Sequence, residues 1–258
     1  MSVKFGTSGL RGLSTDLLGE PSSLYTAAFC HHLQKAGYAE KGDVVLVGQD
    51  YRESSPAIAA NCMGAIAASG FTPVDCGALP TPALAFYGQK RKAASIMITG
   101  SHIPADRNGI KFYLPDGEIT KADEEAISAF AEQLAGTVDQ TSAEGEDEAS
   151  EALAGFGARC TAILPDDALS GMKVGVYQHS TVARDLFIAV LEHYGADVTP
   201  LGFSEEFIPV DTEAVAPETV ELLQGWAGEH GFDAIISADG DADRPLVADE
   251  TGMPLRGD

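Results

Sequence analysis

Residues 233–245 read DAIISADGDADRP, an apolar run that ends directly in an acidic loop. The short run Asp233–Ser237 is bounded by loop residues, which predicts a buried β-strand. The stretch Pro245–Asp249 after the loop predicts a second strand. Because ligand sites of open α/β sheets lie at the carboxyl ends of strands, this loop is the first candidate site in the sequence.

The segments on both sides of this stretch alternate between apolar strands and amphipathic helices. In the second half of the chain we expect strands at Lys173–Tyr177 and Asp197–Leu201, and helices at Val182–Tyr194 and Glu213–His230. In the first half we expect helices at Pro21–Ala36, Ser55–Ser69 and Pro82–Arg91, and strands at Val44–Gly48, Thr72–Cys76 and Ala94–Ile98. Another helix is expected after Thr120, because Thr120 and Asp123 have the spacing of a capping box. The alternation predicts an α/β fold: two tandem α/β domains with mixed or parallel sheets flanked by helices.

A change in composition suggests where one domain ends. Six acidic residues and no basic ones lie between Asp139 and Glu151, among Ser, Thr, Gly and Ala. Such a segment cannot pack a core of its own. We therefore expect a first domain over residues 1–138, an acidic linker over residues 139–160, and a second domain over residues 161–258.

The charge of the chain limits its partners. Its 258 residues include 16 Lys and Arg against 39 Asp and Glu, a formal net charge of −23. This field disfavours nucleic acid and anionic membranes as partners. No apolar run reaches the ~18 residues of a membrane-spanning helix, and the first residues lack a secretory signal. The four cysteines are widely spaced, which is typical of a reducing compartment, so we expect a cytoplasmic location. The sequence does not define the oligomeric state.

The acidic loop has the composition of a metal site. Asp239, Asp241 and Asp243 alternate, so in an extended loop their carboxylates project to the same side. Three adjacent carboxylates repel one another unless a cation neutralises them, and such hard oxygen ligands suit Mg²⁺ or Ca²⁺. A solvated acidic turn is the structural alternative. An EF-hand is excluded because Arg244 stands where the loop requires Gly. The aspartyl phosphoryl-transfer site of haloacid-dehalogenase-like enzymes remains possible from this loop alone.

A second candidate site is the loop ITGSHIPADRNGIKF over residues 98–112. Gly100 frees the backbone beside Ser101, and Pro104 and Asn108-Gly109 predict turns. A serine with His102 adjacent and Lys111 further along could act as a nucleophile or phosphate carrier. The loop is not a hydrolase nucleophile elbow, which would require Gly on both sides of the serine at a spacing of two.

A third, weaker candidate lies at the start of the chain. Residues 4–12 read KFGTSGLRG, in which glycines flank two hydroxyls and an arginine. Such a segment can form a nest of backbone N–H donors for an anion.

The three segments together, in this order, resemble the α-D-phosphohexomutases, the superfamily of phosphoglucomutase, phosphomannomutase and phosphoglucosamine mutase. The resemblance spans the whole chain and implies that Ser101 is the phosphorylated serine. It also implies that Asp239, Asp241 and Asp243 hold Mg²⁺ together with a phosphoserine oxygen. The groups implied around the transferring phosphoryl group or in phosphate binding are Thr7, Ser8, Arg11, His102, Lys111 and Arg244.

The resemblance also implies a reaction. Hexose 1-phosphate and hexose 6-phosphate, of mannose or glucose, would interconvert through a hexose 1,6-bisphosphate, with Lys111 or His102 as proton acceptor. Ile103 departs from the family pattern, which usually has Asn there. Family members have four domains, and the third and fourth, which hold the sugar and a phosphate, are not among these 258 residues, so we expect poor activity from this chain alone. A haloacid-dehalogenase-like enzyme with an Asp nucleophile and a non-enzymatic metal-binding module are the alternatives.

Overall fold

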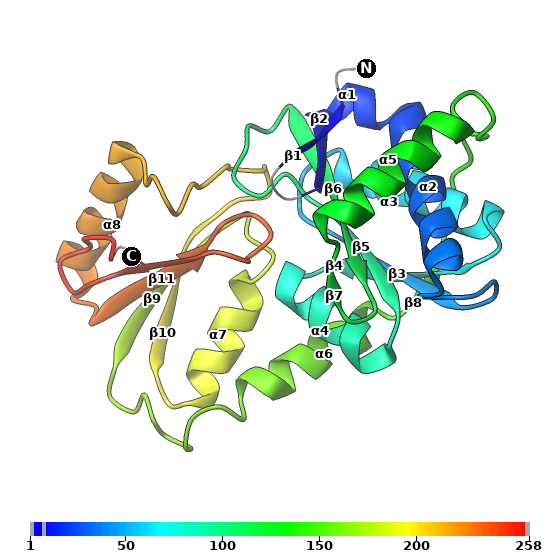
Figure 1. The fold of residues 1–258 in the computed structure, drawn as a ribbon. Helices are drawn as coiled ribbons and strands as arrows, with labels where there is room; N and C mark the ends of the chain where they lie inside the picture. The colour runs from blue at the N-terminus through cyan, green and yellow to red at the C-terminus, as the bar shows by residue number, and fades with distance from the viewer. Residues whose placement is uncertain (1–2, 7–8, 256–258) are drawn as a thin grey trace. The chain divides into compact units, whose positions relative to one another are not determined.

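The computed structural model describes residues 3–6 and 9–255, which form two compact α/β units (Figure 1). The first unit comprises Met1–Gly100 and Ala105–Leu153. The second comprises Ala154–Asp258 together with Ser101–Pro104, the tip of the serine loop. The predicted fold class of two α/β units is confirmed. No helix among the described residues is long and apolar enough to span a membrane.

The first unit is built on one mixed sheet. Its strands are β1 (Lys4–Gly6), β2 (Gly9–Leu13), β3 (Val44–Gln49), β4 (Thr72–Ala78), β5 (Ala94–Ile98), β6 (Arg107–Leu114), β7 (Gly117–Glu118) and β8 (Glu146–Asp147). Their order is β1-β2-β6-β5-β3-β4-β8, with β7 paired to β6. Strands β5, β3, β4 and β8 run parallel, whereas β1, β2, β6 and β7 pair antiparallel with their neighbours. The parallel strands place their carboxyl ends along one edge.

Helices cover both faces of this sheet. They are α1 (Ser14–Leu17), α2 (Glu20–Ala36), α3 (Ser55–Ala68), α4 (Thr81–Arg91) and α5 (Lys121–Leu134). Val45 and Val47 of β3 belong to the core that includes residues of α2, α3 and α5. Gly48 faces the other way, because a Cβ there would lie 2.5 Å from Leu79 and 3.1 Å from Leu84 of α4. Successive side chains of β3 therefore point to opposite faces of the sheet, and helices pack on both faces, so the unit has three layers.

The sequence predicts α2, β3, α3, β4, α4, β5 and α5 of the first unit, but not β1, β2, α1, β6, β7 and β8, of which β6 is the longest. Asn108-Gly109 has the composition of a turn, yet both residues lie in β6. A Cβ on Gly109 would lie 2.7 Å from the backbone O of Thr99 and 2.8 Å from that of Leu10. This glycine therefore permits close strand packing instead of a turn. The predicted capping box is present: Thr120 and Asp123 exchange side-chain to backbone hydrogen bonds at the start of α5.

The acidic segment between the units contains two regular elements. Strand β8 pairs parallel with β4, and helix α6 (Ala149–Cys160) follows it. The change from the first unit to the second falls inside α6, after Leu153. The predicted linker over residues 139–160 and the domain limits at 138 and 161 remain predictions.

The second unit has a four-stranded sheet of order β10-β9-β11-β12. Its strands are β9 (Lys173–His179), β10 (Asp197–Phe203), β11 (Ala234–Ala238) and β12 (Pro245–Ala248), of which only β12 is antiparallel. Helices α7 (Arg184–His193) and α8 (Pro217–His230) lie on opposite faces of this sheet (Figure 1). Helix α8 begins four residues later than predicted, because Oδ1 of Asp211 accepts hydrogen bonds from the backbone N–H groups of Glu213 and Ala214 and forms a turn there.

Candidate active site

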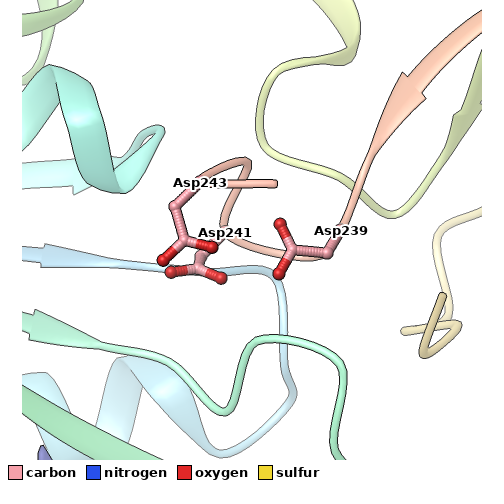
Figure 2. Close-up of side chains that lie close together, drawn as sticks. All are labelled: Asp239, Asp241 and Asp243. Atoms are coloured by element: carbon pink, nitrogen blue, oxygen red, sulfur yellow. The ribbon is translucent and has the colours of Figure 1, made fainter. Parts of the chain in front are cut away.

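The three aspartates of the acidic loop gather their carboxylates at the end of β11 (Figure 2). One oxygen from each of Asp239, Asp241 and Asp243 lies within 4.8 Å of the others. Asp239 and Asp241 are buried, whereas Asp243 is exposed. Burial, and then the charge of Asp241, raise the pKa of Asp239 to about 7. Two buried carboxylates so close together are costly unless a cation joins them, so this donor set fits a hard divalent metal ion.

Backbone geometry fixes the shape of the acidic loop. The N–H of Asp239 donates to the backbone O of Arg244, and the N–H of Arg244 lies 3.3 Å from Oδ1 of Asp239. Ala242 between them adopts a left-handed conformation with φ of 58°. Gly240 has no room for a side chain, because a Cβ would lie 2.9 Å from the ring of Phe207 and 3.0 Å from the backbone O of Ser101. The loop is thus held by its own hydrogen bonds and by close packing.

Ser101, which belongs to the same unit, meets this loop directly. Its Oγ donates a 2.5 Å hydrogen bond to Oδ2 of Asp239. Nη1 of Arg244 lies 3.3 Å from the same Oγ. Ser101 is buried and has a φ of 54°, a region that non-glycine residues seldom occupy. The structure therefore places a carboxylate and a guanidinium within hydrogen-bond distance of one serine hydroxyl.

His102 is oriented by Arg244. Nη1 of Arg244 lies 2.7 Å from Nδ1 of His102. Because a guanidinium can only donate, Nδ1 is the acceptor, and Nε2 carries the proton in neutral His102. The imidazole is thereby held in one tautomer beside Ser101.

Two acidic residues near Arg244 had no recognisable signal in the sequence. Oε1 of Glu213 lies 3.1 Å from Nε of Arg244. The pKa of Asp211 lies below the ordinary value of an aspartate, although burial acts to raise it. Hydrogen bonds from the backbone N–H groups of Ala214 and Glu213, and the charges of His102 and Arg244, lower it. Both precede α8, although the sequence predicts Glu213 as the first residue of that helix, and only the fold brings them near Arg244.

The remaining predicted site residues belong to the first unit. Lys111 is buried on β6, and Arg11 lies on the neighbouring strand β2. A Cβ on Gly9 would lie 3.0 Å from Cα of Lys111, so the start of β2 packs closely on Lys111. Thr7 and Ser8 lie outside the described residues. The roles predicted for these residues remain predictions.

The fold and the site together define a class: a two-unit α/β protein with a serine hydroxyl hydrogen-bonded to a triad of aspartates at a strand end. Residues 2–136 match the phosphoglucomutase/phosphomannomutase α/β/α domain I, and residues 156–252 match domain II. The chain belongs to the phosphoglucomutase/phosphomannomutase family. The predicted resemblance is confirmed, which decides against the haloacid-dehalogenase-like alternative.

Individual relatives agree with the family. A phosphomannomutase of Sinorhizobium fredii is 60% identical over 100% of this chain and 55% of its own length. A phosphoglucosamine mutase of Dinoroseobacter shibae is 34% identical over 98% of this chain and 57% of its own length. The crystal structure of a Thermus thermophilus protein has a TM-score of 0.80 at 25% identity, covering 98% of this chain and 58% of that one. The chain thus spans little more than half the length of the curated relatives it matches.

Proposed function

We propose that this chain carries the phosphoryl-transfer half of a phosphohexomutase. Phosphorylated Ser101 gives its phosphoryl group to a free hydroxyl of a hexose monophosphate. The bond between phosphorus and Oγ breaks, a bond from phosphorus to the sugar oxygen forms, and the hydroxyl proton passes to a base. The resulting hexose 1,6-bisphosphate reorients, and Ser101 takes back the other phosphoryl group. The net reaction interconverts hexose 1-phosphate and hexose 6-phosphate, with the bisphosphate as intermediate and activator.

The hydrogen bond from Ser101 to Asp239 is the observation that supports this proposal most strongly. A serine in an ordinary surface loop has no need of a buried carboxylate and a guanidinium at its oxygen. Arg244 donates to the same oxygen and can bind the non-bridging oxygens of a phosphoryl group attached there. A guanidinium at this position stabilises the negative charge that spreads over a transferring phosphoryl group.

Mg²⁺ is the proposed cofactor. Asp239, Asp241, Asp243 and an oxygen of phosphorylated Ser101 would hold it, a set made entirely of the hard oxygen donors that Mg²⁺ prefers. When bound, the ion would neutralise negative charge at the phosphoryl group. The alternative of a non-enzymatic metal-binding module predicts the same cation without phosphoryl uptake.

Four further residues have proposed roles around the phosphoryl group. Arg11 and Arg244 bind phosphate oxygens, and Lys111 or His102 accepts the proton of the sugar hydroxyl. Nε2 of neutral His102 carries its proton and Nδ1 accepts from Arg244, so His102 must exchange a partner before it can act as base. Thr7 and Ser8 complete the proposed phosphate contacts.

Mannose phosphate is the proposed preferred substrate class, with glucose phosphate second. A relative named phosphomannomutase shares 60% identity across this chain, whereas one named phosphoglucosamine mutase shares 34%. The test is a coupled assay of the full-length protein against mannose, glucose and glucosamine 1-phosphates. Fastest turnover of mannose 1-phosphate supports the proposal, and no interconversion of any of the three overturns it.

A further inference from the structure

The serine loop leaves the first unit at Gly100 and returns to it at Ala105. One buried arginine lies against both stems of this loop, the outgoing stem at residues 99–100 and the returning stem at residues 105–108. Arg52 is only 1% exposed. A Cβ on Gly100 would lie 2.7 Å from Cζ and 2.8 Å from Nε of Arg52. Nη1 of Arg52 donates a 2.9 Å hydrogen bond to the backbone O of Arg107 on the returning stem. A single guanidinium therefore contacts the residue before Ser101 and the strand that follows the loop.

Asp50 ties this guanidinium to the outgoing stem. Its Oδ2 accepts hydrogen bonds from Nε of Arg52 at 3.2 Å and from Oγ1 of Thr99 at 2.8 Å. Its Oδ1 accepts from the backbone N–H of Arg52 at 3.1 Å and from Oγ of Ser55 at 2.6 Å. Asp50 is also 1% exposed, so water does not share these bonds. The carboxylate thus fixes both Arg52 and the residue that precedes Gly100.

The returning stem has a second tie to the same region. Nδ2 of Asn108 donates to Oγ of Ser54 at 2.9 Å and to Oγ of Ser55 at 3.0 Å. Ser55 is also the residue that donates to Asp50. The segment from Asp50 to Ser55 therefore holds both ends of the serine loop through one buried hydrogen-bond network.

We infer that the Asp50–Arg52 pair is a clamp that positions Ser101 for phosphoryl transfer. A buried ion pair adds little to stability, because the loss of hydration offsets the attraction of the charges. Its value here is geometric: it fixes the stems of a loop whose serine has the strained φ of 54°. Such a conformation persists only where the surrounding structure determines it. The clamp also explains why residue 100 is a glycine, since the guanidinium occupies the space of a Cβ.

Two substitutions test the clamp through the rate of phosphoryl uptake, which rests on the proposed function. Arg52→Lys keeps the charge but loses the forked donors. Gly100→Ala places a methyl group against the guanidinium. We expect each variant of the 258-residue chain to take up phosphoryl from glucose 1,6-bisphosphate about 100-fold more slowly, as a displaced reacting group does. In the double variant the uptake rate should fall by less than the product of the two single-variant decreases, because the thinner lysine leaves room for the methyl group.

A matched control and an independent measurement complete the test. Gly155→Ala in α6, where nothing lies within 4 Å of the added Cβ, should leave the uptake rate unchanged. Amide hydrogen exchange over residues 99–110 needs no phosphoryl donor and should speed up in Arg52→Lys. Thr99→Val, which removes only the hydroxyl that donates to Asp50, should show the same change and serves if Arg52→Lys does not fold. If the unmodified chain takes up no phosphoryl, the proposed function fails while the exchange measurement still tests the clamp. If phosphoryl uptake and amide exchange are both unchanged in Arg52→Lys, Gly100→Ala and Thr99→Val, the clamp is overturned.

Discussion

The Oγ of Ser101 lies 2.5 Å from Oδ2 of Asp239, although 138 positions separate the two residues in the chain. The serine loop and the acidic loop therefore form one site within the second unit. The contact joins the group proposed to carry phosphate to the first of the proposed metal ligands.

Asp241→Asn should weaken Mg²⁺ binding at least tenfold, because a neutral amide replaces one of two buried anionic ligands. The folded structure should persist, since the residue lies in a loop. Isothermal titration with Mg²⁺ measures the effect, and Asp249→Asn, at a separate turn after β12, is the matched control. An unchanged affinity in the Asp241 variant would show that the three aspartates are not the Mg²⁺ site.

Gly240→Ala should disturb the contact between the two loops. The added methyl group would lie 2.9 Å from the ring of Phe207 and 3.0 Å from the backbone O of Ser101. We expect phosphoryl uptake to fall about tenfold or more, because a small displacement at a reacting group is costly. Gly228→Ala in α8, which has open space around the Cβ, controls for the substitution itself. Equal uptake rates in the two variants would argue against close packing at Gly240.

Between pH 6.5 and 4, His179 should lower the stability of the second unit, whereas Asp239, whose pKa is raised to about 7, should increase it over the same range. This histidine is fully buried and its Nε2 lies 2.9 Å from the backbone O of Ala238. Burial, together with the charge of Arg184, lowers its pKa to about 4. At His179 the unfolded chain binds a proton below pH 6.5 that the folded chain refuses until about pH 4, so the contribution of His179 to stability is full above pH 6.5 and falls by about 3 kcal/mol across this window.

Urea unfolding at several pH values measures this effect. His179→Asn should remove the His179 contribution, so on acidification this variant should gain stability relative to the unmodified chain, and Asn tolerates the positive φ of 23° at this position. His193→Asn, at an exposed position in the last turn of α7, should keep the pH dependence of the unmodified chain. The same pH dependence in all three proteins would show that His179 does not contribute.

The sequence predicts the parallel strands and their helices well, because short apolar runs bounded by turn residues have few other structures available. It does not predict β6, since Asn108-Gly109 is typical of a turn and only the approach of Leu10 and Thr99 makes it a strand. The spacing of Asp239, Asp241 and Asp243 predicts that their carboxylates gather. The contributions of Asp50, Arg52 and Glu213 depend on long-range packing, so no local pattern reveals them.

The 258-residue chain should take up phosphoryl but interconvert hexose phosphates slowly. It spans little more than half the length of its curated relatives, and binding energy from distant parts of a substrate also lowers the barrier of the chemical step. A coupled assay comparing this chain with a full-length phosphomannomutase measures the difference. Equal turnover would show that the site is complete within these residues.

The most direct test of the central proposal is the position of the phosphoryl group after incubation with glucose 1,6-bisphosphate and Mg²⁺. Intact mass and peptide mapping should find one phosphoryl group on Ser101 in the unmodified chain. The Ser101→Ala variant, with the same fold by circular dichroism, should carry none. A label that persists in Ser101→Ala, or that maps to Asp239, would contradict the assignment of Ser101 as the phosphoryl carrier.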